Sequence, residues 1–389
     1  MVPRTPLDTL LDQVADIATR PLTEAVTLPP EMYGRQDVYE LEVERIFRTD
    51  WMCVGRTDEV PNVGDYRAVD LCEEPLVMVR DQANVVRVLS RICRHRWVEV
   101  VEGTGTAKHL QCPYHHWTYS LSGELVSAPE MADNRAFDKA SCSLPQIRTE
   151  TWLGFVFVNL DGKADPLAPR LAELTQLLEP YQLERQRTVR ATPWGHSPYD
   201  WKLLIDNYLE CYHHAGIHHG SVQPLLPARL TYTETRGGDH WSLAHLPVAA
   251  SAVEPDRLGR KSMPTLLPAA SSLTETQLNE VLIIGIFPAM IFGVSPDFIE
   301  WYHLFPLGPG QIELTIKFVI HPEGLASPIV NHGLAGIVDC LDVIHGEDLG
   351  VLESMQRGVQ SRLATTGPMS HLEETTQQFN RYVARKLCA

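Results

Sequence analysis

The sequence is short of positive charge, and this limits the partners that the protein can bind. Its 389 residues include 33 Lys and Arg against 49 Asp and Glu, which gives a formal net charge of −16 at pH 7. Nucleic-acid binding depends on Lys and Arg side chains that neutralise phosphates, so no nucleic-acid partner is expected. An acidic surface is compatible with an enzyme that docks a basic redox partner.

Long hydrophobic runs are also missing. The longest uncharged run, Val281 to Pro296, is shorter than the ~20 residues of a membrane-spanning helix and is interrupted by Gly285, Pro288 and Gly293. We expect it to form buried strands. The first residues lack the apolar stretch of a secretory signal, and the eight Cys are scattered, so a disulfide framework is not expected. These absences predict a cytoplasmic protein without a membrane partner.

A third absence concerns redox cofactors. No G-x-G-x-x-G motif follows a predicted strand, so the chain carries no evident NAD or flavin domain. If the protein performs redox chemistry, its electrons must therefore come from another protein.

What the sequence does contain is a paired cysteine–histidine motif. Cys93-x-His95 is followed, after sixteen residues, by Cys112-x-x-His115. A structural zinc finger runs Cys-Cys and then His-His, whereas the alternation here suits a two-iron cluster with both Cys on one iron and both His on the other. This is the ligation of a Rieske [2Fe–2S] centre. A zinc site in an interaction module is the alternative.

A second motif lies in a helix predicted near residues 201–215. Glu210 and His213 are three residues apart and would share a helix face. His213 and His218 are five apart, and Gly216 between them is a place for the helix to end and let His218 swing back. Two His and one carboxylate form the facial triad of oxygen-activating non-haem iron enzymes.

The third ligand of such a triad must come from elsewhere in the chain. Asp348, in the C-terminal helical segment, is the best candidate, and its neighbour Glu347 is the alternative. Two further histidines, His214 and His219, are expected to be polar side chains at a partly exposed helix end.

The order of predicted elements indicates an α+β protein. A helix over residues 37–49 precedes short strand-like segments between about 52 and 165, and a Pro-rich stretch at 166–186 marks a domain boundary. Strands are predicted at 279–292, 298–306 and 310–320. Helices follow at about 326–360 and 370–387, the last opened by a capping box of Ser370 and Glu373.

Together these motifs resemble the catalytic α subunit of a Rieske non-haem iron oxygenase of the aromatic ring-hydroxylating type. The resemblance runs from Trp51 through the paired motif to Trp201-Lys202-Leu203, the stretch 206–213 and residues 353–358. It implies a Rieske β-sandwich-like domain at 51–165 and a helix-grip (START-like) catalytic domain with an antiparallel sheet at 166–389. An N-terminal helical segment, 1–50, is expected to pack on the catalytic domain.

The resemblance also implies roles for single residues. The expected cluster ligands are Cys93, His95, Cys112 and His115, and the expected ligands of one mononuclear Fe(II) are His213, His218 and Asp348. Glu210 matches a bridging carboxylate that hydrogen-bonds His213 and, in a head-to-tail homotrimer, His115 of the partner subunit. Asn207 is expected beside it in the active site. Trp97 and His116 depart from the family pattern, which usually has glycine at both positions.

The expected function is that of a terminal oxygenase component. It would use O2, with electrons that start on NAD(P)H and arrive from a flavin and iron–sulfur reductase, with or without a ferredoxin. It would hydroxylate or dihydroxylate an organic substrate, with an aromatic compound as the first choice. A monooxygenase or demethylase of a small quaternary amine is the alternative, and a Rieske electron carrier without oxygenase activity is an alternative of another class. A small β subunit is compatible with the resemblance.

Overall fold

The computed structural model describes residues 5–256 and 258–388, which form two compact units. One unit, here called the cluster unit, comprises residues 47–167. The other, the catalytic unit, comprises residues 1–46 and 168–389. The N-terminal segment therefore belongs to the same compact unit as the C-terminal half of the chain. None of the described helices combines the length and hydropathy required to cross a bilayer.

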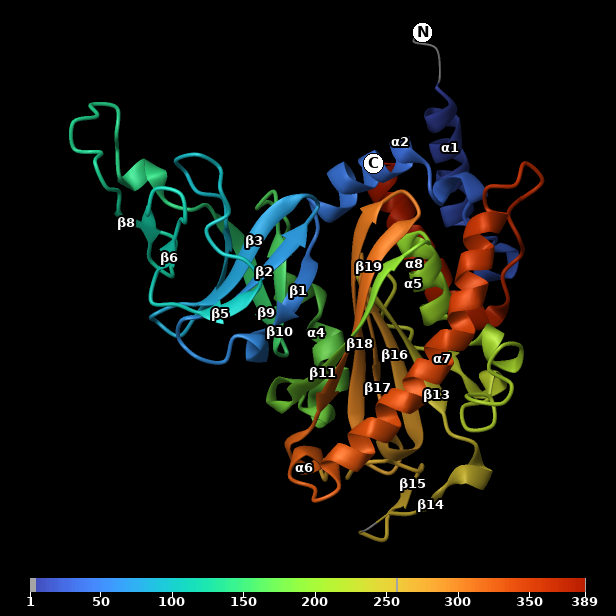
Figure 1. Ribbon diagram of the computed structural model, residues 1–389. Coiled ribbons are helices and arrows are strands. Elements are labelled where there is room, and N and C mark those ends of the chain that lie inside the picture. Colours follow the sequence, from blue (N-terminus) through green and yellow to red (C-terminus); the bar gives the residue numbers. More distant parts are fainter. Residues whose placement is uncertain (1–4, 257, 389) are drawn as a thin grey trace. The chain divides into compact units, whose positions relative to one another are not determined.

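The cluster unit is built on an antiparallel sheet in the order β1-β10-β9-β4-β3-β2-β5, with a small sheet β6-β7-β8 at one end (Figure 1). The bounds of the larger sheet are β1 (Met52–Arg56), β2 (Asp65–Leu71), β3 (Glu74–Arg80), β4 (Val86–Ser90), β5 (Thr104–Thr106), β9 (Gln146–Trp152) and β10 (Phe155–Asn159). The small sheet contains β6 (Leu110–Gln111), β7 (Thr118–Tyr119) and β8 (Leu125–Ser127).

The catalytic unit is built on an antiparallel sheet in the order β11-β19-β18-β17-β16-β13-β12, beside a separate hairpin β14-β15. Its bounds are β11 (Arg187–Ser197), β12 (Tyr232–Thr233), β13 (Trp241–Pro247), β16 (Glu280–Ile286), β17 (Met290–Val294), β18 (Phe298–Gly308) and β19 (Gln311–Ile320), and those of the hairpin are β14 (Glu254–Pro255) and β15 (Lys261–Ser262). The uncharged run 281–296 forms β16 and β17, which are buried strands as predicted.

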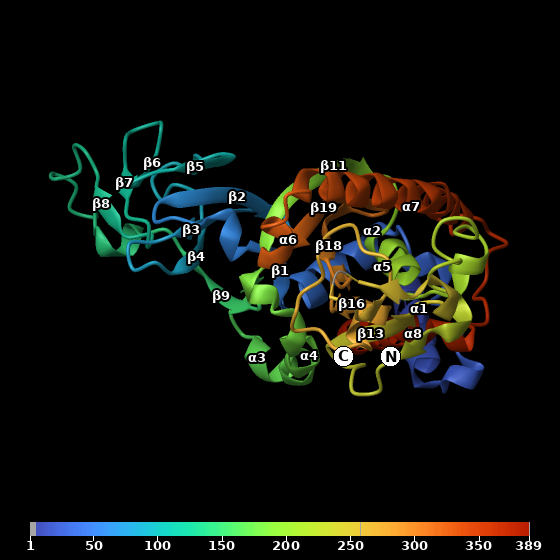
Figure 2. The same ribbon diagram turned by 90° about the horizontal axis from the view of Figure 1, so that it is seen from below.

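Helices of the catalytic unit cover the sheet (Figures 1 and 2). Helix α5 (Trp201–Leu209) packs against β16, β17 and β18 and also against the long helix α7 (Val330–Gly358), which crosses the sheet. Near the two ends of the chain, α1 (Pro6–Thr19) and α8 (Glu374–Leu387) pack side by side. The shorter helices are α2 (Gln36–Glu42), α3 (Leu167–Arg170), α4 (Ala172–Leu178) and α6 (Pro322–Leu325). Antiparallel sheets with helices confirm the predicted α+β class.

Buried polar contacts of Asp200 and Lys202 fix the start of α5. Asp200, the N-cap residue of this helix, accepts a hydrogen bond from the backbone N–H of Lys202, and its own backbone N–H donates to Gln356 Oε1 of α7 at 2.7 Å. The Lys202 ammonium is fully buried between Asp200 and Glu42, at 2.7 and 2.6 Å. A buried cation is tolerated only when it is paired, so these contacts hold α5 to α2 and to α7.

Candidate functional site

The two cysteine–histidine loops have the same backbone conformation. The first follows β4, and the second connects β6 to β7. In the first loop the N–H of Trp97 donates to the carbonyl of Cys93 at 3.1 Å, and in the second the N–H of His116 donates to the carbonyl of Cys112 at 3.1 Å. The matching geometry indicates two equivalent ligand loops rather than two unrelated turns.

Trp97 and His116, the two departures from the family pattern, both lie in the left-handed region with φ of +57°. A side chain at such a φ costs about 1–2 kcal/mol relative to the right-handed conformation, and glycine avoids this cost. The glycine that is usual at these two positions therefore has a conformational reason. The Trp97 side chain is 78% exposed, so no burial of the indole offsets the cost.

The expected cluster ligands are arranged as two pairs. Both thiols, of Cys93 and Cys112, are buried in the core of the cluster unit. The rings of His95 and His115 lie edge to face with centroids 4.6 Å apart, and Trp117 stacks on His95 at 4.9 Å. His95 Nδ1 is buried and has no hydrogen-bond partner, as expected of an atom that faces a metal. The residues present therefore fit a [2Fe–2S] cluster.

The helix that was predicted over 201–215 ends earlier than expected. Helix α5 stops at Leu209, and Glu210 has extended backbone angles, φ −111° and ψ 149°. Glu210 and His213 therefore do not share a helix face, and that prediction was wrong. They meet because the Glu210 carboxylate folds over the following 3₁₀ turn, where it accepts from the backbone N–H of His213 at 3.2 Å and contacts His213 Nδ1 at 2.6 Å.

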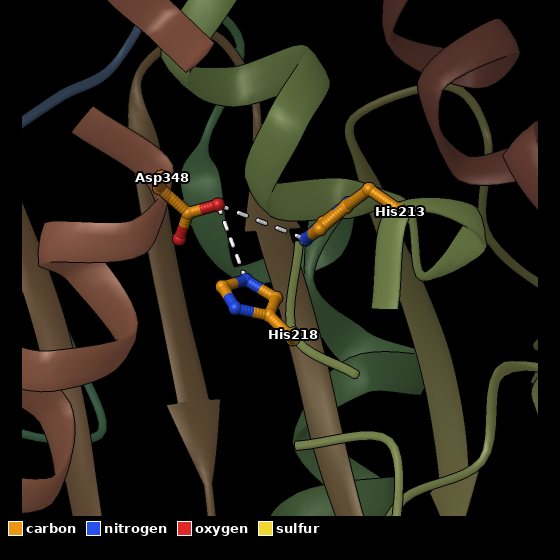
Figure 3. A group of neighbouring side chains, drawn as sticks. All are labelled: His213, His218 and Asp348. Carbon is orange, nitrogen blue, oxygen red and sulfur yellow. Dashed lines mark ion pairs between the residues drawn. The ribbon is translucent and has the colours of Figure 1, made fainter. Parts of the chain in front are cut away.

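His213, His218 and Asp348 come together in the catalytic unit (Figure 3). One ligand atom from each lies within 4.8 Å of the other two, and among the described residues no other group of His, Cys, Asp and Glu meets this condition. Asp348 Oδ1 lies 3.2 Å from His218 Nε2 and 3.8 Å from His213 Nε2. One carboxylate oxygen thus faces two imidazole nitrogens, which is the donor set of a facial triad.

A second set of carboxylates orients these imidazoles. Glu210 contacts His213 Nδ1, and Glu347 contacts His218 Nδ1 at 2.7 Å while also accepting from Ser221 at 2.6 Å. Each imidazole therefore has its Nδ1 held by a carboxylate and its Nε2 free to face a metal, an arrangement that fixes the tautomer and raises the basicity of the ligand. Of the two acids considered for the third ligand, Asp348 joins His213 and His218 in the three-residue group. Glu347 belongs to the outer carboxylates that orient the imidazoles.

Asn207 and His214 complete the immediate surroundings. Asn207 Nδ2 donates to Asp348 Oδ1 at 3.2 Å. His214 was expected at a partly exposed helix end, but it is buried, and its Nδ1 faces the Leu226 carbonyl at 3.2 Å. Burial, with His213 nearby, lowers the pKa of His214 to about 4, so it is neutral near pH 7. His219 is exposed, as expected.

The charges at the site suit a cation. Burial alone would raise the pKa of Asp348, but its hydrogen bond with His218 and the charges of both histidines outweigh burial and lower the pKa. The carboxylate is therefore ionised at neutral pH, which is the form that a metal ligand requires.

A cavity of about 310 Å³ opens beside the triad. Its wall includes Asn207, residues of the segment after His218, and Ile283 on β16. The sequence reasoning missed Asp297, which comes just before β18, and Glu300 on β18, although an acid at an inward-facing position of an apolar strand is a recognisable signal for Glu300.

Comparisons with known proteins agree with this geometry. Residues 50–147 match the Rieske [2Fe-2S] domain family, and residues 186–389 match the family of ring hydroxylating alpha subunits (catalytic domain). The carnitine monooxygenase oxygenase subunit of Escherichia coli (strain K12) is 34% identical over 352 residues, which cover 87% of this chain and 86% of that protein. The biphenyl dioxygenase subunit alpha of Metapseudomonas furukawaii is 33% identical over 324 residues, covering 74% and 69%.

A solved structure shows the same fold. The crystal structure of a quaternary ammonium Rieske monooxygenase in complex with an inhibitor superposes with a TM-score of 0.81 at 25% identity, and 99% of each chain is covered. The predicted pairing of a Rieske domain with a ring-hydroxylase catalytic domain is confirmed.

A Rieske iron–sulfur domain joined to a 2-His-1-carboxylate site defines an oxygenase that stores electrons in one centre and activates O2 at another. The chain belongs to the family of ring hydroxylating alpha subunits, and it is a terminal oxygenase component. A [2Fe–2S] cluster and a mononuclear iron are its cofactors, and it takes electrons from a separate reductase. The electron-carrier and zinc-module alternatives do not account for the catalytic domain.

Proposed function

We propose that the predicted ligand residues carry out the metal binding of this oxygenase. The cluster ligands are Cys93, His95, Cys112 and His115, and the iron ligands are His213, His218 and Asp348. The observation that carries the proposal is the convergence of two imidazoles and one carboxylate at the wall of a cavity large enough for a small organic molecule. When bound, the two metal centres supply single electrons and activate O2 beside the substrate.

The polypeptide positions these reactants. Glu210 and Glu347 hold the imidazoles of His213 and His218 in the orientation that leaves each Nε2 available. Asn207 donates to Asp348 Oδ1 and thereby constrains the carboxylate on the cavity side. The apolar wall, which includes Leu246, excludes bulk water from the reacting carbon.

The reaction that we propose is monooxygenation of a small quaternary amine in this cavity. One oxygen atom enters the substrate and the other leaves as water, with two electrons from the reductase. The proposal is supported by the likeness to carnitine monooxygenase and by two buried acids, Asp297 and Glu300, in a mostly apolar wall. An aromatic substrate is the second candidate, supported by the apolar wall and by the likeness to biphenyl dioxygenase.

We further propose that the chain works as a homotrimer, as the family pattern implies. In that arrangement the Glu210 carboxylate, already held by His213 Nδ1, bridges to His115 of the partner subunit. The exposed imidazole of His115 is available for such a contact. A cytoplasmic location agrees with cysteines that form no disulfide among the described residues.

The experiment that tests the proposal combines metal analysis with turnover. We expect about three irons and two acid-labile sulfides per chain, with a Rieske-type EPR signal after reduction by dithionite. Glu210→Ala, measured after saturation with Fe(II), should have this metal content and the same visible spectrum but lose coupled turnover of a quaternary amine with a reductase and NADH. Unchanged turnover would contradict the bridging role, and zinc without sulfide would contradict the cluster assignment.

A further inference from the structure

The cavity beside the triad is lined by two acids that the oxygenase machinery does not use, Asp297 and Glu300. Glu300 lies on β18, is only 7% exposed, and lines the cavity together with Phe298 and Tyr302. These three residues alternate along the strand, so all three point to the same face of the sheet. Glu300 contacts no member of the triad through any hydrogen bond found in the described residues.

The strand opposite Glu300 is built to leave room for its carboxylate. Gly293 of β17 is its direct cross-strand partner. A Cβ atom at Gly293 would overlap the Glu300 carboxylate, so any other residue there would have to displace it. Gly293 therefore leaves the space that the Glu300 carboxylate occupies at the cavity wall.

Only one of the two oxygens of the Glu300 carboxylate has a hydrogen-bond partner. Its Oε1 accepts a hydrogen bond from the Tyr208 hydroxyl at 3.3 Å, but its Oε2 is buried without a hydrogen-bond partner. The other buried acid of the wall is different, because Asp297 accepts from the backbone N–H groups of Leu266 and Leu267 at 2.9 and 3.0 Å. Asp297 thus has a structural role, whereas one carboxylate oxygen of Glu300 has no hydrogen-bond donor.

Among the described residues, no Lys or Arg forms an ion pair with Glu300. The described residues that line the cavity include no Lys or Arg. A buried, unpaired carboxylate is costly, and burial, reinforced by the charge of Asp297, raises the pKa of Glu300 to about 7. A positively charged ligand in the cavity would supply the missing partner.

Aromatic rings stand beside the carboxylate. The rings of Tyr208 and Tyr302 are 4.7 Å apart and tilted by 58°, and both line the cavity. The faces of such rings attract cations, including quaternary ammonium groups that cannot donate hydrogen bonds. Carboxylate and rings together make one place in the cavity that is suited to a positive charge.

We propose that Glu300, seated against Gly293 and flanked by Tyr208 and Tyr302, is the specificity-determining residue that selects an organic cation over a neutral molecule of the same shape. This inference rests on the proposed function, since it concerns the cavity of the oxygenase. It assigns the discrimination to one carboxylate, which the likeness to relatives does not identify.

The test compares a cation with its uncharged isostere. Choline and 3,3-dimethyl-1-butanol differ by a nitrogen and its charge, and binding of each to the purified holoenzyme is measured by calorimetry. The wild-type protein should bind choline at least about tenfold more tightly, and Glu300→Gln should remove that preference. Glu280→Gln is the matched control, because Glu280 is a buried acid of the neighbouring β16 that pairs with His245 and lies outside the cavity wall.

A second variant keeps the test decisive if Glu300→Gln folds poorly. Gly293→Ala places a methyl group where the Glu300 carboxylate lies. It should weaken choline binding, while the affinity for the neutral isostere falls much less. Equal affinities of the wild-type protein for the two probes, or a preference that survives in Glu300→Gln, would overturn the inference.

The outcomes separate this inference from the proposed function. Turnover of a neutral aromatic such as biphenyl, with no preference for choline, would leave the oxygenase intact and remove the role of Glu300. A strong preference for choline without O2-dependent turnover of any quaternary amine would support Glu300 and contradict the proposed reaction.

Discussion

The two units of the molecule build their metal sites in opposite ways. In the cluster unit, all four expected ligands fall between Cys93 and His115, on two loops with the same hydrogen bonds. In the catalytic unit, the triad joins two imidazoles near the end of α5 to a carboxylate on α7, Asp348, more than a hundred residues later. The first site is a local motif that short β hairpins hold in shape, and the second exists only after two helices have packed.

The difference extends to the surroundings of the ligands. In the ligand loops of the cluster unit, strain lies in the backbone itself, at Trp97 and His116, which both have positive φ. In the catalytic unit the ligands are held by side chains, since each imidazole is fixed by its own carboxylate. A local site therefore depends on turn geometry, and a dispersed site depends on a second layer of hydrogen bonds.

The largest expected effect comes from removing one ligand from either site. Asp348→Ala should lose the mononuclear iron and all turnover but keep two irons and two sulfides per chain, because its unit is separate from the cluster unit. Cys112→Ser should lose the sulfide while the catalytic unit still binds Fe(II). Iron and sulfide analysis with EPR measures both. Retention of the mononuclear iron in Asp348→Ala would move the ligand role to Glu347.

A smaller effect is expected from the outer carboxylate. Glu347→Gln leaves the triad intact but replaces the acceptor that holds His218 Nδ1. Loss of such a partner typically costs 10–100-fold in metal affinity or activity. Fe(II) titration of the metal-depleted protein, followed by turnover, measures this, and Ser221→Ala is the control because it leaves the contact between Glu347 and His218 in place. A titration curve like that of the wild-type protein would argue against the orienting role.

The smallest effect concerns backbone strain in the cluster unit. Trp97→Gly relieves a positive φ at a side chain that is 78% exposed, and we expect stabilisation of up to about 1 kcal/mol after the flexibility of glycine is counted. Trp97→Ala is the control, since it removes the indole but keeps the strained Cβ. Thermal loss of the cluster absorbance compares the variants. Destabilisation by both would mean that the indole makes contacts that outweigh the strain.

The same contrast explains what could be predicted from sequence. The expected cluster ligands could be named from sequence because their spacing is itself the pattern, and the α+β class followed from the order of strand-like and helical segments. The early end of α5 at Leu209 was missed, since nothing in the local sequence forbids Glu210 from continuing the helix. Glu300 was missed for another reason: its role depends on Gly293 across the sheet and on the lack of Lys and Arg among the described residues that line the cavity.

The hydrogen bond between Gln356 of α7 and the backbone of Asp200 has a consequence for how the iron is taken up. It ties the helix that carries Asp348 to the start of the helix that leads to His213, and no metal takes part in the connection. The ligands are therefore brought into register when the chain folds, unlike those of a zinc finger, which order only around their ion. Iron lost during purification should accordingly be replaceable by simple addition of Fe(II), without refolding of the protein.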